Sequence, residues 1–215
     1  MDDLCRNVSG ARVLDLGCGK GEYSLSLLSR GAHVTGVDIS DKYVNCAREA
    51  AQSACLDHSR FVFKVMDAHA LEFQDGSFDL VVGSGILHHL DMFRALDELC
   101  RVLKPGGRTL FLEPLAGNPL LKLFRLMTPR ARTRDERPLT RGDLRTLAAD
   151  GRWEFTATYS GLVCAPVAIV TSLLLRPFPN NPCLRLAGFV EQYLNRWPFL
   201  RPLNQYVLIE ITKRS

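Results

Sequence analysis

The chain has 215 residues, of which 47% are hydrophobic and 23% charged, and its formal net charge is +4. This ordinary composition argues against disorder except at the ends and predicts one globular domain. The seven cysteines form no CxxC pair, so we expect free thiols and neither a disulfide framework nor a metal site. The start, Met-Asp-Asp-Leu, lacks the basic and apolar regions of a signal peptide, which makes a cytoplasmic location the default expectation.

The charge is distributed unevenly along the chain. Residues 1–113 carry 12 basic and 16 acidic side chains, whereas residues 114–215 carry 15 basic and 7 acidic ones. A basic second half suggests contact with something anionic. The alternative is that its arginines only solvate the surface of an apolar region. We expect no nucleic-acid partner.

The first half alternates between short apolar runs and segments with helical spacing. The runs typical of buried parallel strands are 12–16, 32–38, 61–65, 78–82 and 108–113. The helical segments between them are 22–30, 40–53 and 91–103, the last ended by Pro105-Gly106-Gly107. Because such crossovers are right-handed, the alternation predicts an α/β fold with a doubly wound, mostly parallel sheet.

Beyond the fifth strand this alternation ends. Residues 114–139 hold prolines and an arginine cluster, and they predict a loop with a short helix near 119–127. Residues 141–149 are expected to be helical and 153–159 to form a strand. Residues 206–212, Tyr-Val-Leu-Ile-Glu-Ile-Thr, predict a final strand.

An apolar insert lies between those last two strands. From Phe155 to Arg176 the first charged side chain is Arg176 itself, but Ser160-Gly161 and Pro166 interrupt the run. We considered a wall or lid of a substrate pocket, a membrane-surface patch and a true membrane span, in decreasing order of preference. The first two both predict an apolar substrate.

The glycine-rich loop Asp15-Leu16-Gly17-Cys18-Gly19-Lys20-Gly21 follows the first strand and precedes a helix. Glycines there let the backbone turn tightly and bring a ligand against N–H groups at a helix N-terminus. Asp38 ends the next strand, where a carboxylate can accept both hydroxyls of a ribose. The loop suits a nicotinamide dinucleotide or S-adenosylmethionine (SAM). Its G-x-G-x-G spacing, and an acidic Asp67 after the third strand, favour SAM.

These motifs together resemble the class I SAM-dependent methyltransferases, in particular the methyltransferase type 11 group. The matching segments are 13–21, 37–40, 67–68, 78–82, 87–90 and 103–108. The resemblance implies a Rossmann-like, seven-stranded sheet with an antiparallel last strand. It also implies that Gly17 and Gly19 line the methionine end of SAM, Asp38 the ribose, and Asp67 and Ala68 the adenine. The full set of expected cofactor-binding residues is Asp15, Gly17, Cys18, Gly19, Asp38, Ile39, Asp67, Ala68 and Gly83.

The resemblance divides the single domain into a SAM-binding core (11–113), a substrate or lid elaboration (114–203) and a final strand (204–213). Members of this family usually carry helices before the first strand that close over SAM, whereas about ten residues precede it here. We therefore expect a lid from 114–139 or 161–203. The alternative is a shortened form with weak cofactor binding.

Three residues at the carboxyl edge of the sheet are candidates for catalysis: His88, His89 and Glu113. A general base is needed only if the acceptor is protonated at rest, and neutral imidazole is a suitable base near pH 7. A histidine that only orders the loop is the alternative. We expect methyl transfer from SAM to an oxygen, nitrogen or carbon of a small, partly hydrophobic metabolite or lipid, with peripheral membrane contact. The competing functions are a catalytically silent SAM-binding regulatory module and a nicotinamide oxidoreductase.

Overall fold

A computed structural model describes residues 5, 7–118, 137–174 and 181–214. These residues form a seven-stranded sheet in the order β3-β2-β1-β4-β5-β7-β6. Its strands are β1 (Arg12–Leu16), β2 (His33–Asp38), β3 (Phe61–Val65), β4 (Phe78–Ser84), β5 (Leu103–Pro114), β6 (Trp153–Ser160) and β7 (Tyr206–Lys213). All neighbours pair in parallel except β7, which is antiparallel to both β5 and β6. The predicted fold, including the antiparallel last strand, is confirmed.

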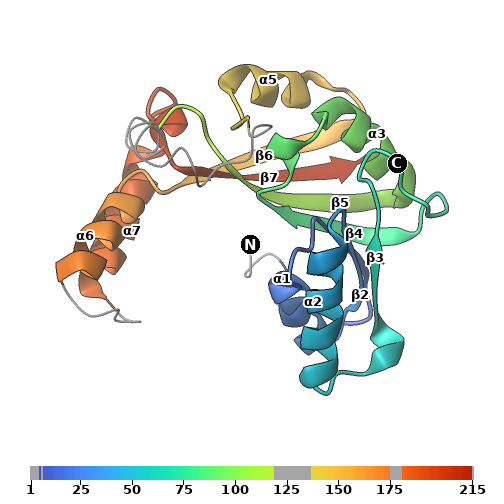
Figure 1. Ribbon diagram of the computed structural model, residues 1–215. Helices are drawn as coiled ribbons and strands as arrows, with labels where there is room; N and C mark the ends of the chain where they lie inside the picture. Colours follow the sequence, from blue (N-terminus) through green and yellow to red (C-terminus); the bar gives the residue numbers. More distant parts are fainter. Residues whose placement is uncertain (1–4, 6, 119–136, 175–180, 215) are drawn as a thin grey trace.

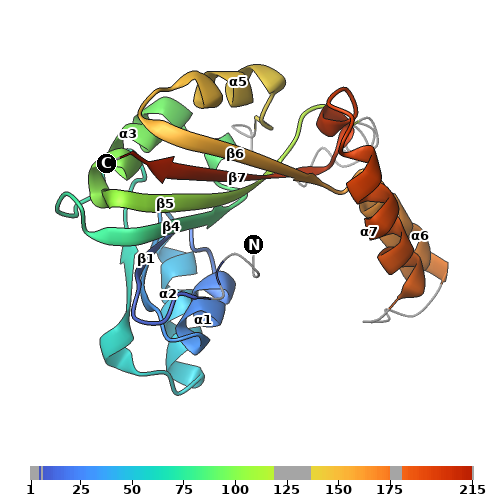
Figure 2. The same cartoon turned by 180° about the vertical axis from the view of Figure 1, so that it is seen from behind.

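Helices cover both faces of the sheet (Figures 1 and 2). The helices are α1 (Glu22–Ser29), α2 (Asp41–Ser53), α3 (Met92–Val102), α5 (Arg141–Ala149), α6 (Cys164–Leu174) and α7 (Pro182–Leu194), with 3₁₀ turns η1 (His58–Arg60), η2 (Leu87–His89) and η4 (Arg201–Leu203). Helices α1 and α2 lie on one face, and α3 and α5 lie on the other. The sheet is therefore doubly wound, as right-handed crossovers require.

The core on the α3 and α5 face is continuous from β1 to β7. Leu99 of α3 and Leu147 of α5 pack with Phe111 and Ile209, all of them at most 1% exposed. Polar caps start the helices where the sequence places them: the Ser40 side chain accepts from the Tyr43 N–H, for example. Such a cap contributes about 1 kcal/mol.

One predicted boundary is wrong. Leu103 was assigned to the helix that begins after Asp91, but α3 ends at Val102 and Leu103 pairs with Phe78 as the first residue of β5. Pro105 contributes to this difference, because it disfavours helical conformation at Lys104 and its ring would clash with the Arg101 carbonyl in a continued helix. The predicted short helix near 119–127 and the arginines between 125 and 134 lie outside the described residues.

The apolar insert between β6 and β7 folds as a hairpin of α6 and α7. This hairpin projects beyond the carboxyl edge of the sheet, well away from the C-terminus (Figures 1 and 2). Glu191 of α7 joins its two helices: its carboxylate is 6% exposed and accepts from the N–H groups of Gly161, Val163 and Cys164 at 2.8–2.9 Å. Within the described ranges, no helix combines the length and the apolar character needed to cross a membrane.

Candidate functional site

The glycine-rich loop is fixed by backbone hydrogen bonds to the end of β2. The N–H groups of Gly17 and Cys18 donate to the Val37 carbonyl at 2.8 and 2.9 Å, and the Gly19 N–H donates to Asp38 Oδ2 at 2.9 Å. Gly17 has φ 68° and Gly19 has φ 52°, values that L-residues rarely adopt. The two positions thus require glycine, and Asp38 is brought against the loop as the sequence predicted.

A cavity of about 630 Å³ opens beside this loop. Four expected cofactor residues line it: Asp15, Gly17, Cys18 and Gly19. A Cβ built on Gly19 would meet no atom within 4 Å, so a side chain there would enter the open space that a ligand needs. The volume lies within the range of small-molecule and cofactor sites. The accessible backbone of the loop, the carboxylates beside it and the cavity volume together fit a nucleoside with a charged amino-acid tail. SAM is a molecule of this kind.

Asp15 lies at the base of this cavity and is 3% exposed. Its Oδ2 accepts a hydrogen bond of 2.6 Å from the Ser24 hydroxyl. Burial raises the pKa of Asp15 from 3.8 to about 6, and the nearby Asp38 carboxylate adds to the shift. A carboxyl group with this pKa can change its charge when a cation binds.

Cys18 is an inert member of the loop. Its side chain is 7% exposed, and burial raises the pKa of its thiol to about 12. The thiol therefore stays protonated at neutral pH and packs rather than reacts. All seven cysteines are free, as expected.

The other expected cofactor residues lie outside the lining of this cavity. Ile39 follows the last residue of β2 and is 77% exposed. Asp67 Oδ1 accepts from both the N–H and Nδ1 of His69, which lowers the pKa of Asp67 and keeps it an acceptor. At position 83 close packing requires glycine, because a Cβ there would lie 2.7 Å from atoms of Ile86 and Phe111.

His88 in η2 and Glu113 at the end of β5 form a buried hydrogen-bonded pair. His88 Nδ1 lies 2.7 Å from Glu113 Oε2, and the N–H groups of Ile86 and Leu87 donate to Oε1 at 3.0 and 2.9 Å. Glu113 is 0% exposed and His88 is 8% exposed. Because a carboxylate only accepts, the proton of the neutral imidazole sits on Nδ1, and Nε2 is left as the basic nitrogen.

This geometry changes the interpretation of Glu113. The sequence analysis offered Glu113 as a base or a substrate contact, but both of its oxygens are engaged and buried. It orients His88 instead. His89 is exposed, and its ring lies 4.1 Å from that of His88, centroid to centroid, at a tilt of 38°.

A second cavity, of about 230 Å³, lies beside His88. Its apolar walls come from Leu87, Leu90, Met92, Phe93 and Leu139, and polar groups come from His88, Asp91, Arg137 and Asp143. Strand β4 and the turn after it connect the two cavities, because Ser84 at the end of β4 lines the larger one and His88 in η2 lines the smaller. The arrangement can hold a small, partly apolar molecule against an imidazole.

Several site residues were not found from the sequence. Ser24, Tyr43 and Ser84 support or line the larger cavity without belonging to a motif. His69 also belongs to no motif, yet its Nε2 accepts from the Asp91 N–H while its Nδ1 contacts Asp67. The available signal was the Asp-x-His spacing, which is typical of a side chain folding back on a turn.

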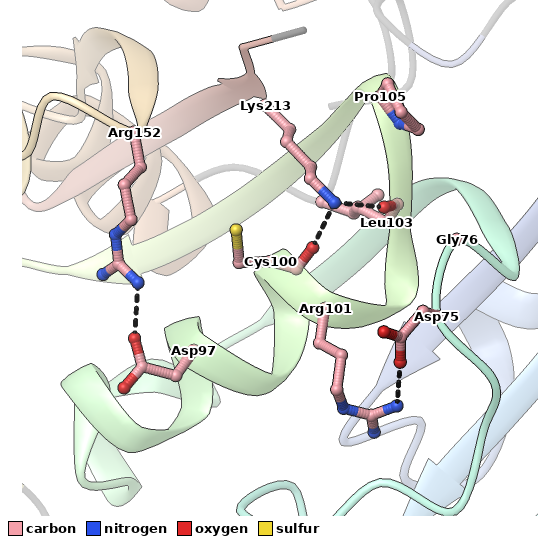
Figure 3. A pocket seen from close by; sticks show the side chains of 9 residues that line it. All are labelled: Asp75, Gly76, Asp97, Cys100, Arg101, Leu103, Pro105, Arg152 and Lys213. Atoms are coloured by element: carbon pink, nitrogen blue, oxygen red, sulfur yellow. Dashed lines mark hydrogen bonds and ion pairs between the residues drawn. The ribbon is translucent and has the colours of Figure 1, made fainter.

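The groove at the opposite end of the sheet has a structural role (Figure 3). It measures about 710 Å³, and its charged groups bind one another. Arg152 pairs with Asp97 at 2.6 Å and Arg101 with Asp75 at 3.0 Å, while Lys213 Nζ donates to two carbonyls at the end of α3 (Figure 3). These cations stabilise the C-terminal end of α3 rather than form a ligand site.

The sequence also matches a known family across this same core. Residues 14–111 match the family described as Methyltransferase domain. The chain carries a class I SAM-dependent methyltransferase domain. Its family depends on SAM, so the match excludes the nicotinamide interpretation and agrees with the geometry of the glycine-rich loop.

Two curated methyltransferases are similar to about half of this chain. The 27-O-demethylrifamycin SV methyltransferase of Amycolatopsis mediterranei is 41% identical over 102 residues, which cover 46% of this chain and 37% of that protein. The demethylmenaquinone methyltransferase of Thermus thermophilus is 40% identical over 114 residues, or 52% of this chain and 50% of that protein. The chain thus aligns with half or less of each relative.

A solved structure of a SAM-dependent methyltransferase from Methanosarcina mazei shares the fold over nearly the whole of both chains. Its TM-score is 0.63 at 25% identity, and the alignment covers 96% of this chain and 93% of that one. The likeness in fold therefore extends well beyond residues 14–111, which match the family.

Proposed function

We propose that this protein is an enzyme that transfers a methyl group from SAM to a small, partly hydrophobic metabolite or lipid. The observation that carries the proposal is the buried His88–Glu113 pair, because His88 lines the smaller cavity only four residues after Ser84, which lines the larger one. A bound SAM supplies an activated methyl group on a sulfonium. The protein's main task is then to hold an acceptor in line with that methyl, which can lower the barrier by roughly 7–11 kcal/mol.

The larger cavity is proposed to bind the cofactor. Asp15 meets its cationic amino-acid end, while Gly17 and Gly19 give the backbone room for close approach. Asp38, whose oxygens already accept from the N–H groups of Gly19 and Ser40, has further lone pairs for the ribose hydroxyls. Ile39, Asp67 and Ala68 are proposed to surround the adenine, as the family resemblance implies.

The smaller cavity is proposed to bind the acceptor. Its five apolar side chains suit a hydrophobic body, and His88 is placed to accept a proton at Nε2. A base matters only for a nucleophile that is protonated at rest, so the pair favours a hydroxyl among the three acceptor atoms considered. Relatives named for demethylmenaquinone and 27-O-demethylrifamycin SV support a small organic acceptor.

Two further proposals concern the organisation of the domain and its contact with a membrane. Residues 11–113 form the SAM-binding core and 114–203 shape the acceptor side, with 204–213 as the last strand. The apolar hairpin of α6 and α7 supports peripheral membrane contact, a proposal independent of methyl transfer.

Two measurements test the proposed activity. Calorimetry with SAM first establishes binding. Incubation with SAM carrying a trideuterated methyl group and a panel of hydroxylated quinone and polyketide acceptors then follows transfer by mass spectrometry. We expect labelled product that is lost in Glu113→Gln but not in Val62→Ser, an exposed site on β3. SAM binding without transfer to any acceptor would instead support the silent SAM-binding module.

A further inference from the structure

Helix α7 presents an apolar stripe to solvent. Leu186, Phe189, Val190 and Tyr193 follow the i, i+3, i+4, i+7 spacing of one helix face, and they are 42–79% exposed. Trp197 continues the stripe past the end of the helix, at 50% exposed. Surface helices of globular proteins normally turn such a stripe towards the core. Here the opposite side of α7 packs against α6, and the apolar stripe faces outwards.

Between β6 and β7 the described residues present no exposed acidic side chain. Glu191 is the single acid between Glu154 and Glu210 in the sequence, and it is buried against three backbone N–H groups. Arg185 and Arg196, by contrast, are exposed beside the stripe. The face is therefore both apolar and positively charged, and it needs a partner that is apolar and negatively charged.

An anionic lipid surface fits this face better than a second copy of the chain. A two-fold interface places the same patch on both partners, which would bring arginines against arginines. A lipid bilayer instead offers acyl chains to the aromatic stripe and anionic headgroups to the arginines. Tyrosine and tryptophan, both present in the stripe, are the side chains enriched at membrane interfaces.

We propose that the outward face of α7 and the turn after it, residues 186–199, is a docking surface for an anionic membrane. The stripe from Leu186 to Trp197 is about 16 Å long at 1.5 Å per residue, so α7 lies in the plane of the bilayer rather than across it. The proposal rests on the membrane contact proposed above and does not depend on methyl transfer. The hairpin projects beyond the carboxyl edge of the sheet (Figure 2), and residues at or just after the carboxyl ends of β1 and β4 line the two cavities, so docking brings that edge close to lipid-soluble acceptors.

Sedimentation with vesicles tests the surface directly. The full chain is mixed with vesicles of neutral phosphatidylcholine, or with vesicles that also contain about 30% anionic phosphatidylglycerol. Each mixture is measured at low and at high salt. We expect binding to the anionic vesicles at low salt and release as the salt rises. The double variant Phe189→Ser/Tyr193→Ser should bind about tenfold more weakly, because two interfacial aromatics are lost.

Matched controls lie on the far end of the sheet. Val62→Ser/Val65→Ser removes two similarly exposed apolar side chains from β3, and Arg214→Glu reverses an exposed charge after β7. Both should bind like the wild type, whereas Arg185→Glu should bind about fivefold more weakly. The chain has two tryptophans, and Trp153 is 3% exposed, so a blue shift of emission on vesicle binding reports Trp197.

Each contrary result has a separate meaning. If the wild type binds anionic vesicles and the α7 variants bind equally well, the surface assignment is overturned while membrane contact stands. If the wild type ignores all vesicles but forms a dimer that Phe189→Ser/Tyr193→Ser abolishes, the face is a self-interface and both membrane proposals fail. SAM affinity, measured by calorimetry on every variant, is expected to equal that of the wild type, so it reports on the cofactor site separately.

Discussion

The raised pKa of Asp15 predicts that SAM binding depends on pH. Asp15 is buried beneath the larger cavity, and burial holds its pKa at about 6 in the free protein. A cationic ligand above it favours the ionised form, so the proton on Asp15 must leave when the ligand binds. At pH 7 about nine in ten molecules already carry the ionised carboxylate, but at pH 5 only about one in ten does.

The affinity of SAM should therefore fall about tenfold between pH 7 and pH 5, which corresponds to about 1.4 kcal/mol. Isothermal titration calorimetry in two buffers of different ionisation enthalpy measures both the affinity and the proton released. We expect close to one proton released per SAM at pH 5 and almost none at pH 7. Asp15→Asn should bind more weakly at pH 7 and lose this dependence. The Ser24 hydroxyl can still donate to the amide oxygen, so the variant should fold.

The same shift has a consequence for stability, with a definite sign. The pKa of Asp15 is higher in the folded chain than its ordinary value of 3.8, so its contribution is fully present below pH 4 and is lost as the pH rises through about 6. The loss amounts to about 3 kcal/mol in the free protein. Equal pH slopes for SAM binding in the wild type and in Asp15→Asn would refute the reasoning, because some other group would then bind the proton.

Three further predictions concern single side chains. Asp38→Ala should weaken SAM binding by about 1–3 kcal/mol, since a charged acceptor is lost, and an unchanged affinity in a folded variant would remove the ribose assignment. Glu113→Gln presents an amide N–H₂ to His88 Nδ1 and so moves the imidazole proton to Nε2; we expect turnover to fall roughly 10²–10⁴-fold with SAM affinity kept, as for His88→Ala. Loss of binding with turnover intact at saturating SAM would assign the pair to loop ordering. Glu191→Ala should destabilise the hairpin by about 1.5–3 kcal/mol, seen as faster proteolysis between β6 and β7; equal proteolysis would show that packing alone holds it.

The sequence predicts the first half of the fold well because its signals are local. The strand at 61–65 was placed with the observed bounds, and the helix after Ser40 begins at the predicted cap. Each of these depends on a short apolar run or on one capping residue, so no distant contact is needed to recognise it. The error at Leu103 also has a local cause, since an apolar side chain at helical spacing fits either element.

The sequence is less informative wherever a residue acts through a distant partner. His88 and Glu113 were both predicted at the carboxyl edge. Their hydrogen bond, however, joins residues 25 positions apart in the sequence and depends on how β4 and β5 pair. Glu191 carries no motif at all, because its three partners are backbone N–H groups at and just before the start of α6, 27 to 30 residues away in the sequence. Helix α7 was missed for a different reason. A helical spacing of apolar residues is normally interpreted as a face that packs on the core, whereas the apolar stripe of α7 faces outwards.

The pairing of β6 with β7 has a consequence for how this protein diversifies. Ser160 and Tyr206 are directly opposite each other in the sheet, so the 45 residues between them leave and return at one point. Antiparallel neighbours need only a two-residue turn to connect them. The whole hairpin can therefore be shortened, replaced or exchanged during evolution without moving any strand of the sheet. The seven-stranded sheet and the hairpin can therefore vary in sequence and length independently of each other.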